Sequence, residues 1–292
     1  MKNNRARACK DYFYPVSLFT VFKKPLSKKV LGSLLLILPG YFAFAQDVNA
    51  DDNLTSPLIT DRPDVTESPS TVAAGILQVE TGALYESYKQ DVVKQEAFTF
   101  NTTLLRLGIS ENLELRLGWD FVEGQSRING NKLDDVSSGF NPLLVGAKIN
   151  IVKEKGLLPE IGALVHLHLP FTASRDYKPE TTGVDFIFSF AHTLNKKSNL
   201  SYNLGAQWQN DSPEAAYTYS LSYGYALLGD LGMYAEVYGN LPENNKANHL
   251  WDVGMTYLIS KDVQVDATVG SSITEGQDML LSAGVSFRLP VW

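Results

Sequence analysis

The stretch from Leu113 to Phe121, which reads Leu-Glu-Leu-Arg-Leu-Gly-Trp-Asp-Phe, constrains the fold of this chain more than any other feature. Every odd position is apolar, and every even position is charged or glycine. Successive side chains of a β-strand point to opposite faces, so the pattern predicts a strand with one apolar and one polar face. A helix would instead scatter the charges around its axis. Alternation alone leaves two folds open: a soluble sheet that buries the leucines, or a transmembrane barrel that turns them to lipid.

The same alternation continues from Gly75 to the C-terminus and predicts twelve strands. Most of them have about the 9–11 residues that a tilted membrane strand needs. The alternation is weakest in 97–109, in 231–239 and in 184–194, where Ile187 breaks it. The predicted strands are 76–88, 97–109, 113–122, 142–152, 159–169, 184–194, 199–209, 216–228, 231–239, 249–259, 263–271 and 279–289.

The connections between these strands alternate in length. Long polar loops are expected at 89–96, 123–139 and 171–183, whereas 110–112 and 229–230 are tight turns. Outer-membrane barrels have long loops at the outer rim and short turns at the inner one. The chain is therefore expected in the cell outer membrane, with its N- and C-termini in the periplasm.

The tryptophans and the strand number also favour the membrane barrel. With this topology Trp119, Trp208 and Trp251 fall at outer strand ends on the apolar face, and Trp292 falls at the inner end, as in interfacial aromatic girdles. Soluble barrels that fill their interior with apolar side chains use about eight strands. Together these features predict an all-β fold, a transmembrane antiparallel up-and-down β-barrel of about 12 strands of the Gram-negative outer-membrane type.

The N-terminus has the features of a secretory signal peptide over residues 1–45. Basic residues precede an apolar run from Val30 to Leu38, and Ala43-Phe-Ala45 provides a cleavage motif before Gln46. The only cysteine, Cys9, lies in this segment, so no disulfide is expected in the mature chain. Removing the segment takes away eight of the 25 basic and one of the 32 acidic residues and leaves a formal charge near −14. This charge disfavours nucleic acid as a partner.

Residues 46–74 are polar and aperiodic and contain Pro57, Pro63 and Pro69, so they cannot form a central strand. Two interpretations stay open: a solvated periplasmic N-terminal segment, or a plug folded into the lumen of the barrel that follows at 75–292. In the second case the charged side chains of the segment would pair with the wall. The plug candidates are Asp61, Arg62, Asp64 and Glu67.

The charged side chains on the polar strand faces are the candidate functional residues, because each would cost about 2–4 kcal/mol on the lipid face at mid-depth. They form either the wall of a pore with an acidic excess, which would favour cations, or a ladder of cross-strand ion pairs that fills the lumen. The lumen candidates are Glu80, Arg106, Glu114, Arg116, Asp120, Lys148, Glu160, His166, His168, Asp185, Asp252, Asp266 and Arg288.

No metal site, cofactor or catalytic residue is predicted. His166 and His168 share one strand face, but no third ligand is spaced to complete a zinc site. An outer-membrane hydrolase of the phospholipase type would need a serine and a histidine at the outer boundary, where only His249 stands. A closed structural or docking barrel is the other alternative.

One segment resembles a known family. Thr60-Asp-Arg-Pro-Asp-Val-Thr-Glu-Ser-Pro69, followed by the strand Gly75-Ile-Leu-Gln-Val-Glu-Thr-Gly82, is similar to the MetA-pathway of phenol degradation family of outer-membrane transporters. Phe140–Lys148, Leu158–Gly162 and Leu169–Thr172 look like later segments of that family. The resemblance implies a β-barrel and a transport role, without catalytic residues or a defined substrate.

The sequence thus predicts an outer-membrane channel for passive passage of small molecules, with aromatic and hydrophobic ones among the candidates, through an acidic lumen. Its expected partners are outer-membrane lipid and a small-molecule solute. The alternation leaves the oligomeric state open.

Overall fold

The computed structural model describes residues 56–208, 213–274 and 276–292. The predicted signal peptide lies outside these residues. Within them the chain is built almost entirely from β-strands, with two short 3₁₀ turns, and no helix among them is long and apolar enough to cross a membrane. The elements are β1 (Ile76–Gln90), β2 (Val93–Ser110), β3 (Leu113–Ile128), β4 (Asn131–Phe140), β5 (Leu143–Val152), β6 (Glu160–Leu169), η2 (Pro170–Thr172), η3 (Arg175–Tyr177), β7 (Gly183–Asn195), β8 (Ser198–Trp208), β9 (Ala215–Leu228), β10 (Leu231–Pro242), β11 (Asn248–Ser260), β12 (Val263–Ser272) and β13 (Gln277–Pro290).

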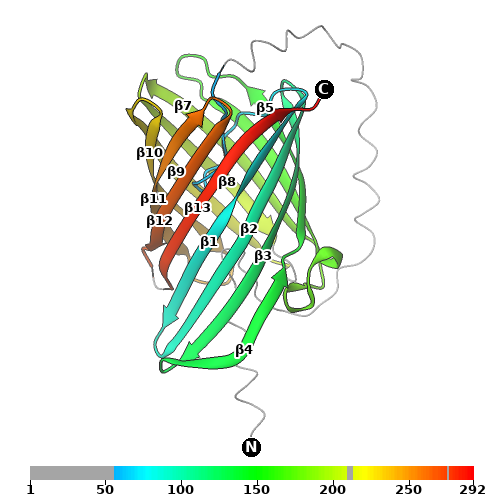
Figure 1. Ribbon diagram of the computed structural model, residues 1–292, viewed down its shortest axis with the longest axis vertical. Helices are drawn as coiled ribbons and strands as arrows, with labels where there is room; N and C mark the ends of the chain where they lie inside the picture. The colour runs from blue at the N-terminus through cyan, green and yellow to red at the C-terminus, as the bar shows by residue number, and fades with distance from the viewer. Residues whose placement is uncertain (1–55, 209–212, 275) are drawn as a thin grey trace, which may run out of the picture.

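The strands close into an antiparallel barrel (Figure 1). The first strand, β1, pairs with β2 on one side and with β13 on the other. β4 pairs with the end of β3 and β5 with its beginning, so these two segments share one position in the wall, interrupted at Pro142. Proline lacks the backbone donor that a central ladder needs. The described strands therefore fill twelve positions, and the predicted barrel is confirmed.

Two of the expected loops are instead extended hairpins. The loop expected at 89–96 is a turn at 91–92 between β1 and β2, and the loop expected at 123–139 is a turn at Asn129-Gly130 between β3 and β4. Asn129 and Gly130 have φ of 51° and 79°, the backbone conformation that tight hairpin turns need. These hairpins project beyond the rest of the barrel (Figure 1). Their alternation is hidden in the sequence because both faces are polar there.

Burial shows which strand face is outside. On β3, Leu115 is 47% exposed, whereas Glu114 and Arg116 on the opposite face are 0% and 2% exposed. The same inversion holds on β5, where Val145 is exposed and Lys148 is buried. Apolar side chains outside and charged ones inside are the reverse of a soluble protein and the rule in a membrane barrel.

The aromatic side chains agree with this arrangement, with one correction. Trp208 and Trp251 lie near strand ends with exposed side chains, and Trp292 follows the last strand. The expectation that Trp119 ends its strand is wrong, because β3 continues to Ile128 and places Trp119 in mid-strand.

The barrel has two different rims. Two-residue turns join β2 to β3, β7 to β8, β9 to β10 and β11 to β12 at one end, which we call the short-turn rim. The start of β1 and the end of β13 pair at this rim. The extended hairpins and the connection 170–182 lie at the opposite end, the long-loop rim.

Residues 56–75 form a re-entrant segment inside the barrel. The segment begins at the short-turn rim, where the Leu58 amide donates to the Lys261 carbonyl (2.8 Å), and returns there, where the Gly75 amide donates to the Gly108 carbonyl (3.0 Å). Between these points its residues contact the inward side chains of the wall. The wall and the segment therefore have to be considered together.

Candidate functional site

Asp61 of the re-entrant segment is the centre of an ion-pair network inside the barrel. Its Oδ2 lies 3.1 Å from Nη1 of Arg106, 3.1 Å from Nη2 of Arg116 and 2.7 Å from Nζ of Lys148. The strand register explains the convergence, because Arg106 on β2 and Arg116 on β3 are directly opposite each other. Like charges in that position repel. A carboxylate from outside the wall removes this repulsion.

Two wall carboxylates complete this network. Glu80 on β1 accepts a hydrogen bond from Nη1 of Arg106 (2.8 Å) and another from the Asp61 amide (3.1 Å). Glu114 on β3 accepts from Nε of Arg106 (2.9 Å) and from the Val72 amide (2.8 Å). Both carboxylates therefore bind the wall cation and the backbone of the re-entrant segment together.

Glu67 binds the same cations from the other side of Asp61. Its carboxylate accepts from Nη1 of Arg116 (2.8 Å) and lies 3.2 Å from Nζ of Lys148, and its amide donates to Asn203 on β8 (2.7 Å). Burial by itself would raise the pKa of Glu67, but the charges of Arg116 and Lys148 outweigh it and lower the pKa well below its usual value. Glu67 is therefore held as a carboxylate.

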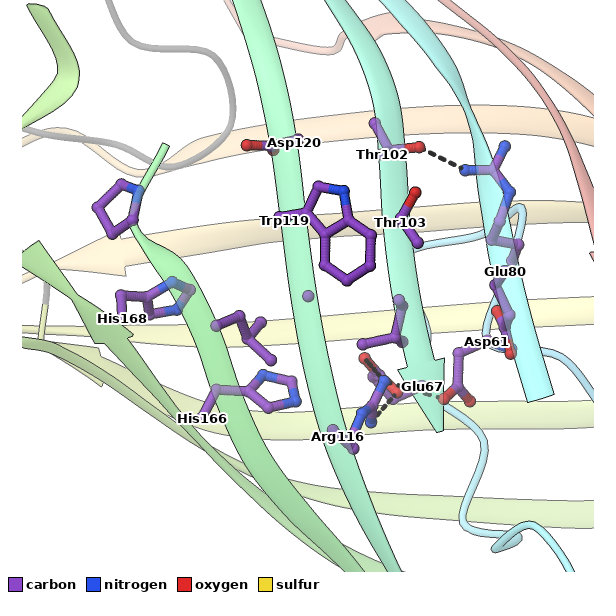
Figure 2. Close-up of a pocket in the computed structure, with 15 residues that line it drawn as sticks. Asp61, Glu67, Glu80, Thr102, Thr103, Arg116, Trp119, Asp120, His166 and His168 are labelled. Carbon is purple, nitrogen blue, oxygen red and sulfur yellow. Dashed lines mark hydrogen bonds and ion pairs between the residues drawn. The ribbon is translucent and has the colours of Figure 1, made fainter. Parts of the chain in front are cut away.

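Arg62 is the one basic residue of the segment, and it binds a different part of the wall. It donates to Asp266 on β12 (2.9 Å), to Ser282 on β13 (3.1 Å) and to Thr102 on β2 (3.3 Å; Figure 2 draws this last bond). A Cβ at Gly284 would collide with the guanidinium. The wall is therefore shaped to admit this side chain.

The wall formed by β9, β10 and β11 is acidic. Glu236 on β10 accepts from the Val65 amide (2.8 Å) and from the Thr66 hydroxyl, and Ser222 on β9 donates to Asp64 (2.9 Å). Burial raises the pKa of Asp64 well above its usual value, and the charge of Glu236 adds to the shift. Asp252 on β11 is buried directly opposite Glu236 on β10. Its Oδ1 has no hydrogen-bond partner among the described residues.

Two further predicted residues contact the segment near the short-turn rim. Glu160 accepts from the Ser70 hydroxyl (3.2 Å) and from Lys153 (3.0 Å). Arg288 donates to Asp262 in the β11–β12 turn (2.8 Å) and to the carbonyl of Ser56.

The two histidines form a small cluster with Asp185 on the wall of the barrel. Nε2 of His168 lies 2.7 Å from the carboxylate of Asp185, and Nδ1 of His166 lies 3.7 Å from it. Within the described residues no group of three or more metal-ligating side chains could hold a metal ion. The cluster is therefore part of the polar lining.

A cavity of about 270 Å³ lies between the segment and the wall formed by β1, β2, β3, β5 and β6 (Figure 2). Charged side chains of the segment form one side of it, and Asp120, His166 and His168 contribute polar groups from the wall. Leu104, Leu144 and Pro142 add an apolar surface. The lining residues are Asp61, Arg62, Glu67, Glu80, Thr102, Thr103, Leu104, Arg116, Gly118, Trp119, Asp120, Pro142, Leu144, His166 and His168.

The sequence missed several inward residues. Glu236 was overlooked because 231–239 alternates poorly, although Tyr234, Glu236 and Tyr238 recur every second residue and all three are buried. Asn150, Asn203 and Ser222 bind the segment but carry no charge, so no rule based on charge could select them.

The fold and its polar interior define a transmembrane β-barrel of the outer-membrane type. Residues 60–289 match the family described as "Putative MetA-pathway of phenol degradation", and the chain belongs to this family. The resemblance noted in the sequence is thereby confirmed. No curated protein sequence matches the chain.

The fold is similar to that of a solved outer-membrane channel. The COG4313 outer membrane channel from Pseudomonas putida F1 superposes with a TM-score of 0.58 at 13% identity, over 76% of this chain and 98% of that one. The KdgM porin reaches 0.44 at 13% identity over 70% of this chain and 98% of that one. The CymD monoaromatic hydrocarbon channel reaches 0.41 at 9% identity, over 75% and 89%. At 13% identity the similarity to the COG4313 channel supports a shared fold and nothing about function. The other two structures superpose with TM-scores below 0.5, which is too low to support a shared fold.

Proposed function

We propose that this protein is an outer-membrane channel for passive passage of small solutes, and that residues 56–74 are a plug in its short-turn half. The observation that carries the proposal is the re-entrant segment itself. Its charged residues bind a wall whose cations would otherwise repel each other. The strands that it contacts through hydrogen bonds are β1, β2, β3, β5, β6, β8, β9, β10, β12 and β13.

The orientation follows from the two rims. Outer-membrane barrels carry short turns on the periplasmic side and longer connections outside. In this orientation the short-turn rim, with the end of β13 and the start of β1, faces the periplasm. The plug then closes the periplasmic half, and the extended hairpins lie at the cell surface.

The lining supports a preference among solutes. The cavity beside the plug places leucine, proline and tryptophan side chains next to charged and hydroxyl groups, so it offers an apolar surface beside hydrogen-bonding partners. Aromatic or hydrophobic molecules with a polar substituent fit this surface. The carboxylates of Asp64, Glu236 and Asp252 make the far wall acidic, which favours cations over anions.

Single-channel conductance in planar bilayers tests the proposal. The full-length chain should give small or infrequent openings, and deletion of 56–74 should give a larger, steady conductance because the plug no longer fills the lumen. The ratio of potassium permeability to chloride permeability should exceed one in both forms. Heat-modifiable migration in detergent gels shows whether the deletion variant still forms a barrel.

Two outcomes would contradict parts of the proposal. A folded deletion variant with the conductance of the full chain would mean that 56–74 is not a plug. A folded deletion variant without conductance would favour the closed structural or docking barrel.

The hydrolase alternative has a separate test. Nδ1 of His249 lies 2.7 Å from the hydroxyl of Tyr219, not from a serine. A phospholipase assay on the purified barrel should show no activity that His249→Ala removes. Activity lost on that substitution would reject the channel as the principal function.

A further inference from the structure

Three carboxylates meet where the re-entrant segment packs against β9, β10 and β11. Ser222 on β9 donates to Asp64 of the segment (2.9 Å) and is directly opposite Glu236 on β10. Glu236 is in turn directly opposite Asp252 on β11. We call Asp64, Glu236 and Asp252 the acidic cluster. Like charges repel at this spacing, so the three groups cannot all be ionised without a cost in free energy.

No basic side chain offsets these charges in the part of the chain that the structure describes. None of the ion pairs found there includes a member of the acidic cluster. The three cations of the opposite wall bind Asp61 instead. Arg62 is two residues from Asp64 but binds Asp266 on β12 (2.9 Å). The acidic cluster is therefore neutralised by something other than a basic side chain.

Two buried polar atoms of this region have no hydrogen-bond partner among the described residues. One is Oδ1 of Asp252, a residue that is 2% exposed, and the other is the hydroxyl of Tyr238, which is 3% exposed. The negative charges that act on this hydroxyl are those of Asp252, Glu236 and Glu86. A buried carboxylate oxygen that accepts no hydrogen bond is unfavourable as an anion and favourable as an acid. Asp252 is therefore suited to hold a proton.

The other titratable groups around the acidic cluster do not offset its charge. Asp61 of the segment acts on Asp64 with a further negative charge. β10 contributes the hydroxyls of Tyr234 and Tyr238, which are neutral below about pH 10, and β1 contributes Glu86. β9 presents serines. Each of these neighbours is acidic or neutral, so a proton is the counter-charge that the cluster itself can take up.

The acidic cluster accommodates a charge on Glu236 better than a charge on its other two members. Both carboxylate oxygens of Glu236 accept from the segment, one from the Val65 amide (2.8 Å) and the other from the Thr66 hydroxyl. A charge on Glu236 therefore holds the segment against the wall. Further charges on Asp64 and Asp252 have the opposite effect, because one belongs to the segment and the other to the wall, and they repel each other.

We propose that protonation of the acidic cluster holds residues 64–66 against β9, β10 and β11, and that loss of the protons releases these residues into the lumen. The part of the segment around Asp61 stays bound, because its partners are cations. The inference adds a form of regulation to the plug and therefore rests on the function proposed above.

The direction of the pH dependence follows from Asp64. Burial raises the pKa of this carboxyl group, and the charge of Glu236 adds to the shift. A group whose pKa is raised by folding contributes stability below its ordinary pKa, and this contribution is lost as the pH rises through the folded value. The contact between the segment and the acidic wall should therefore be present at low pH and lost at high pH.

Spin labels on single introduced cysteines test the proposal with the full-length barrel in lipid bilayers. The only natural cysteine, Cys9, lies in the predicted signal peptide. Val65 and Ile59 are both exposed positions of the segment, at 47% and 54%, but the carbonyl of Ile59 accepts a hydrogen bond from Arg106. Between pH 5 and pH 8.5 the mobile fraction of a label at Val65 should rise at least about threefold, because the cluster loses its protons. A label at Ile59 should be unchanged.

Asp64→Asn combined with Asp252→Asn removes the charges that form at high pH and nearly keeps the size of both side chains. In this double variant the label at Val65 should be as immobile at pH 8.5 as at pH 5. Asp230→Asn, in an exposed turn, is the matched control and should retain the full response of the unmodified chain. Heat-modifiable migration in detergent gels shows whether each variant forms a barrel.

Four results would overturn the proposal. The label at Val65 could keep its mobility across this pH range, both labels could gain mobility equally, or the double variant could retain the response. The fourth is release of the label when choline replaces potassium at constant pH, which would mean that a bound cation holds the segment in place of protons.

Conductance separates this inference from the proposed function. A label that is released at high pH in a barrel without conductance would support the proton control and contradict the channel. A conducting barrel whose label at Val65 does not respond to pH would reject this inference and leave the channel proposal intact.

Discussion

Asp61 shows how one side chain can organise the interior of a barrel. It accepts from Arg116 and Lys148, its amide donates to Glu80, and its Oδ1 accepts from the Ser68 amide within the segment. The carboxylate therefore binds cations on three strands of the wall and, through the Ser68 amide, a later part of the re-entrant segment. Few positions in the described chain combine so many charged contacts on one residue.

Asp61→Asn is expected to release the plug. The substitution leaves buried cations without their shared anion, and breaking a buried ion pair typically costs about 3–5 kcal/mol. Because the strand ladder is untouched, the barrel should persist, and conductance should rise toward that of the chain lacking 56–74. Asp230→Asn, in an exposed turn at the short-turn rim, is the matched control and should conduct like the unmodified chain.

Asp64→Asn is expected to stabilise the folded protein, and only at high pH. Because the pKa of Asp64 is raised on folding, its contribution is fully present below the unfolded pKa and is lost as the pH rises through the folded value. Asparagine removes that loss. The variant should therefore unfold at a higher temperature than the unmodified chain at pH 8 and at the same temperature at pH 3.5.

Asp262→Asn provides the comparison of opposite sign. Hydrogen bonding from Arg288 lowers the pKa of Asp262, so its contribution is present above the unfolded pKa and is lost as the pH falls through the folded value. This variant should be less stable than the unmodified chain at pH 8 and no different at pH 2. Equal effects of both substitutions at pH 8 would contradict the assigned pKa directions.

At the scale of single elements, β9 shows how a strand faces two solvents. Leu221 and Tyr223 are exposed on the outside, whereas Ser220 and Ser222 are buried and bind Thr66 and Asp64 of the re-entrant segment. The strand is stable in this position only if the exposed face meets hydrocarbon. The strand ends at Leu228, at the short-turn rim.

Leu221→Arg and Leu228→Arg therefore test the depth of β9 in the membrane. Arginine at Leu221, in mid-strand, should destabilise the barrel by about 2–4 kcal/mol, and at Leu228 by about 0–1 kcal/mol. Unfolding in denaturant in the presence of lipid bilayers measures the difference. Equal costs at the two positions would contradict the membrane level assigned to the strand.

For the whole molecule, closure is the feature on which stability depends. β1 and β13 pair along nearly their whole length, from Ile76 opposite Pro290 to Tyr88 opposite Gln277. This pairing removes the free edges that an open sheet would expose to lipid. The re-entrant segment adds contacts inside a wall that is already closed.

The chain lacking 56–74 should therefore still form a barrel. Without boiling it should migrate differently from the boiled sample in detergent gels, as the full chain should, but it should lose this difference at a lower temperature. Migration that no longer changes on boiling would mean that the segment is needed for closure itself.

The sequence was most informative where one strand face meets lipid and the other faces the polar interior of the barrel. Alternation located Leu113–Phe121 and the later strands within a few residues, and it indicated that Arg106 and Glu114 share a face. It failed at β4 and at the ends of β1 to β3, where both faces are polar and the pattern that identifies a strand disappears. For the same reason it placed Trp119 at the end of its strand, whereas β3 continues to Ile128.

By itself, the sequence determined that the chain forms a membrane barrel, because a period of two residues separates apolar from charged side chains along every long segment. Only the tertiary structure decided which side chains meet inside. Asp61 lies 87 residues from Lys148 in the chain, and Arg62 lies 204 residues from Asp266. No local pattern encodes such contacts, since they depend on the registers of many strands added around a closed wall.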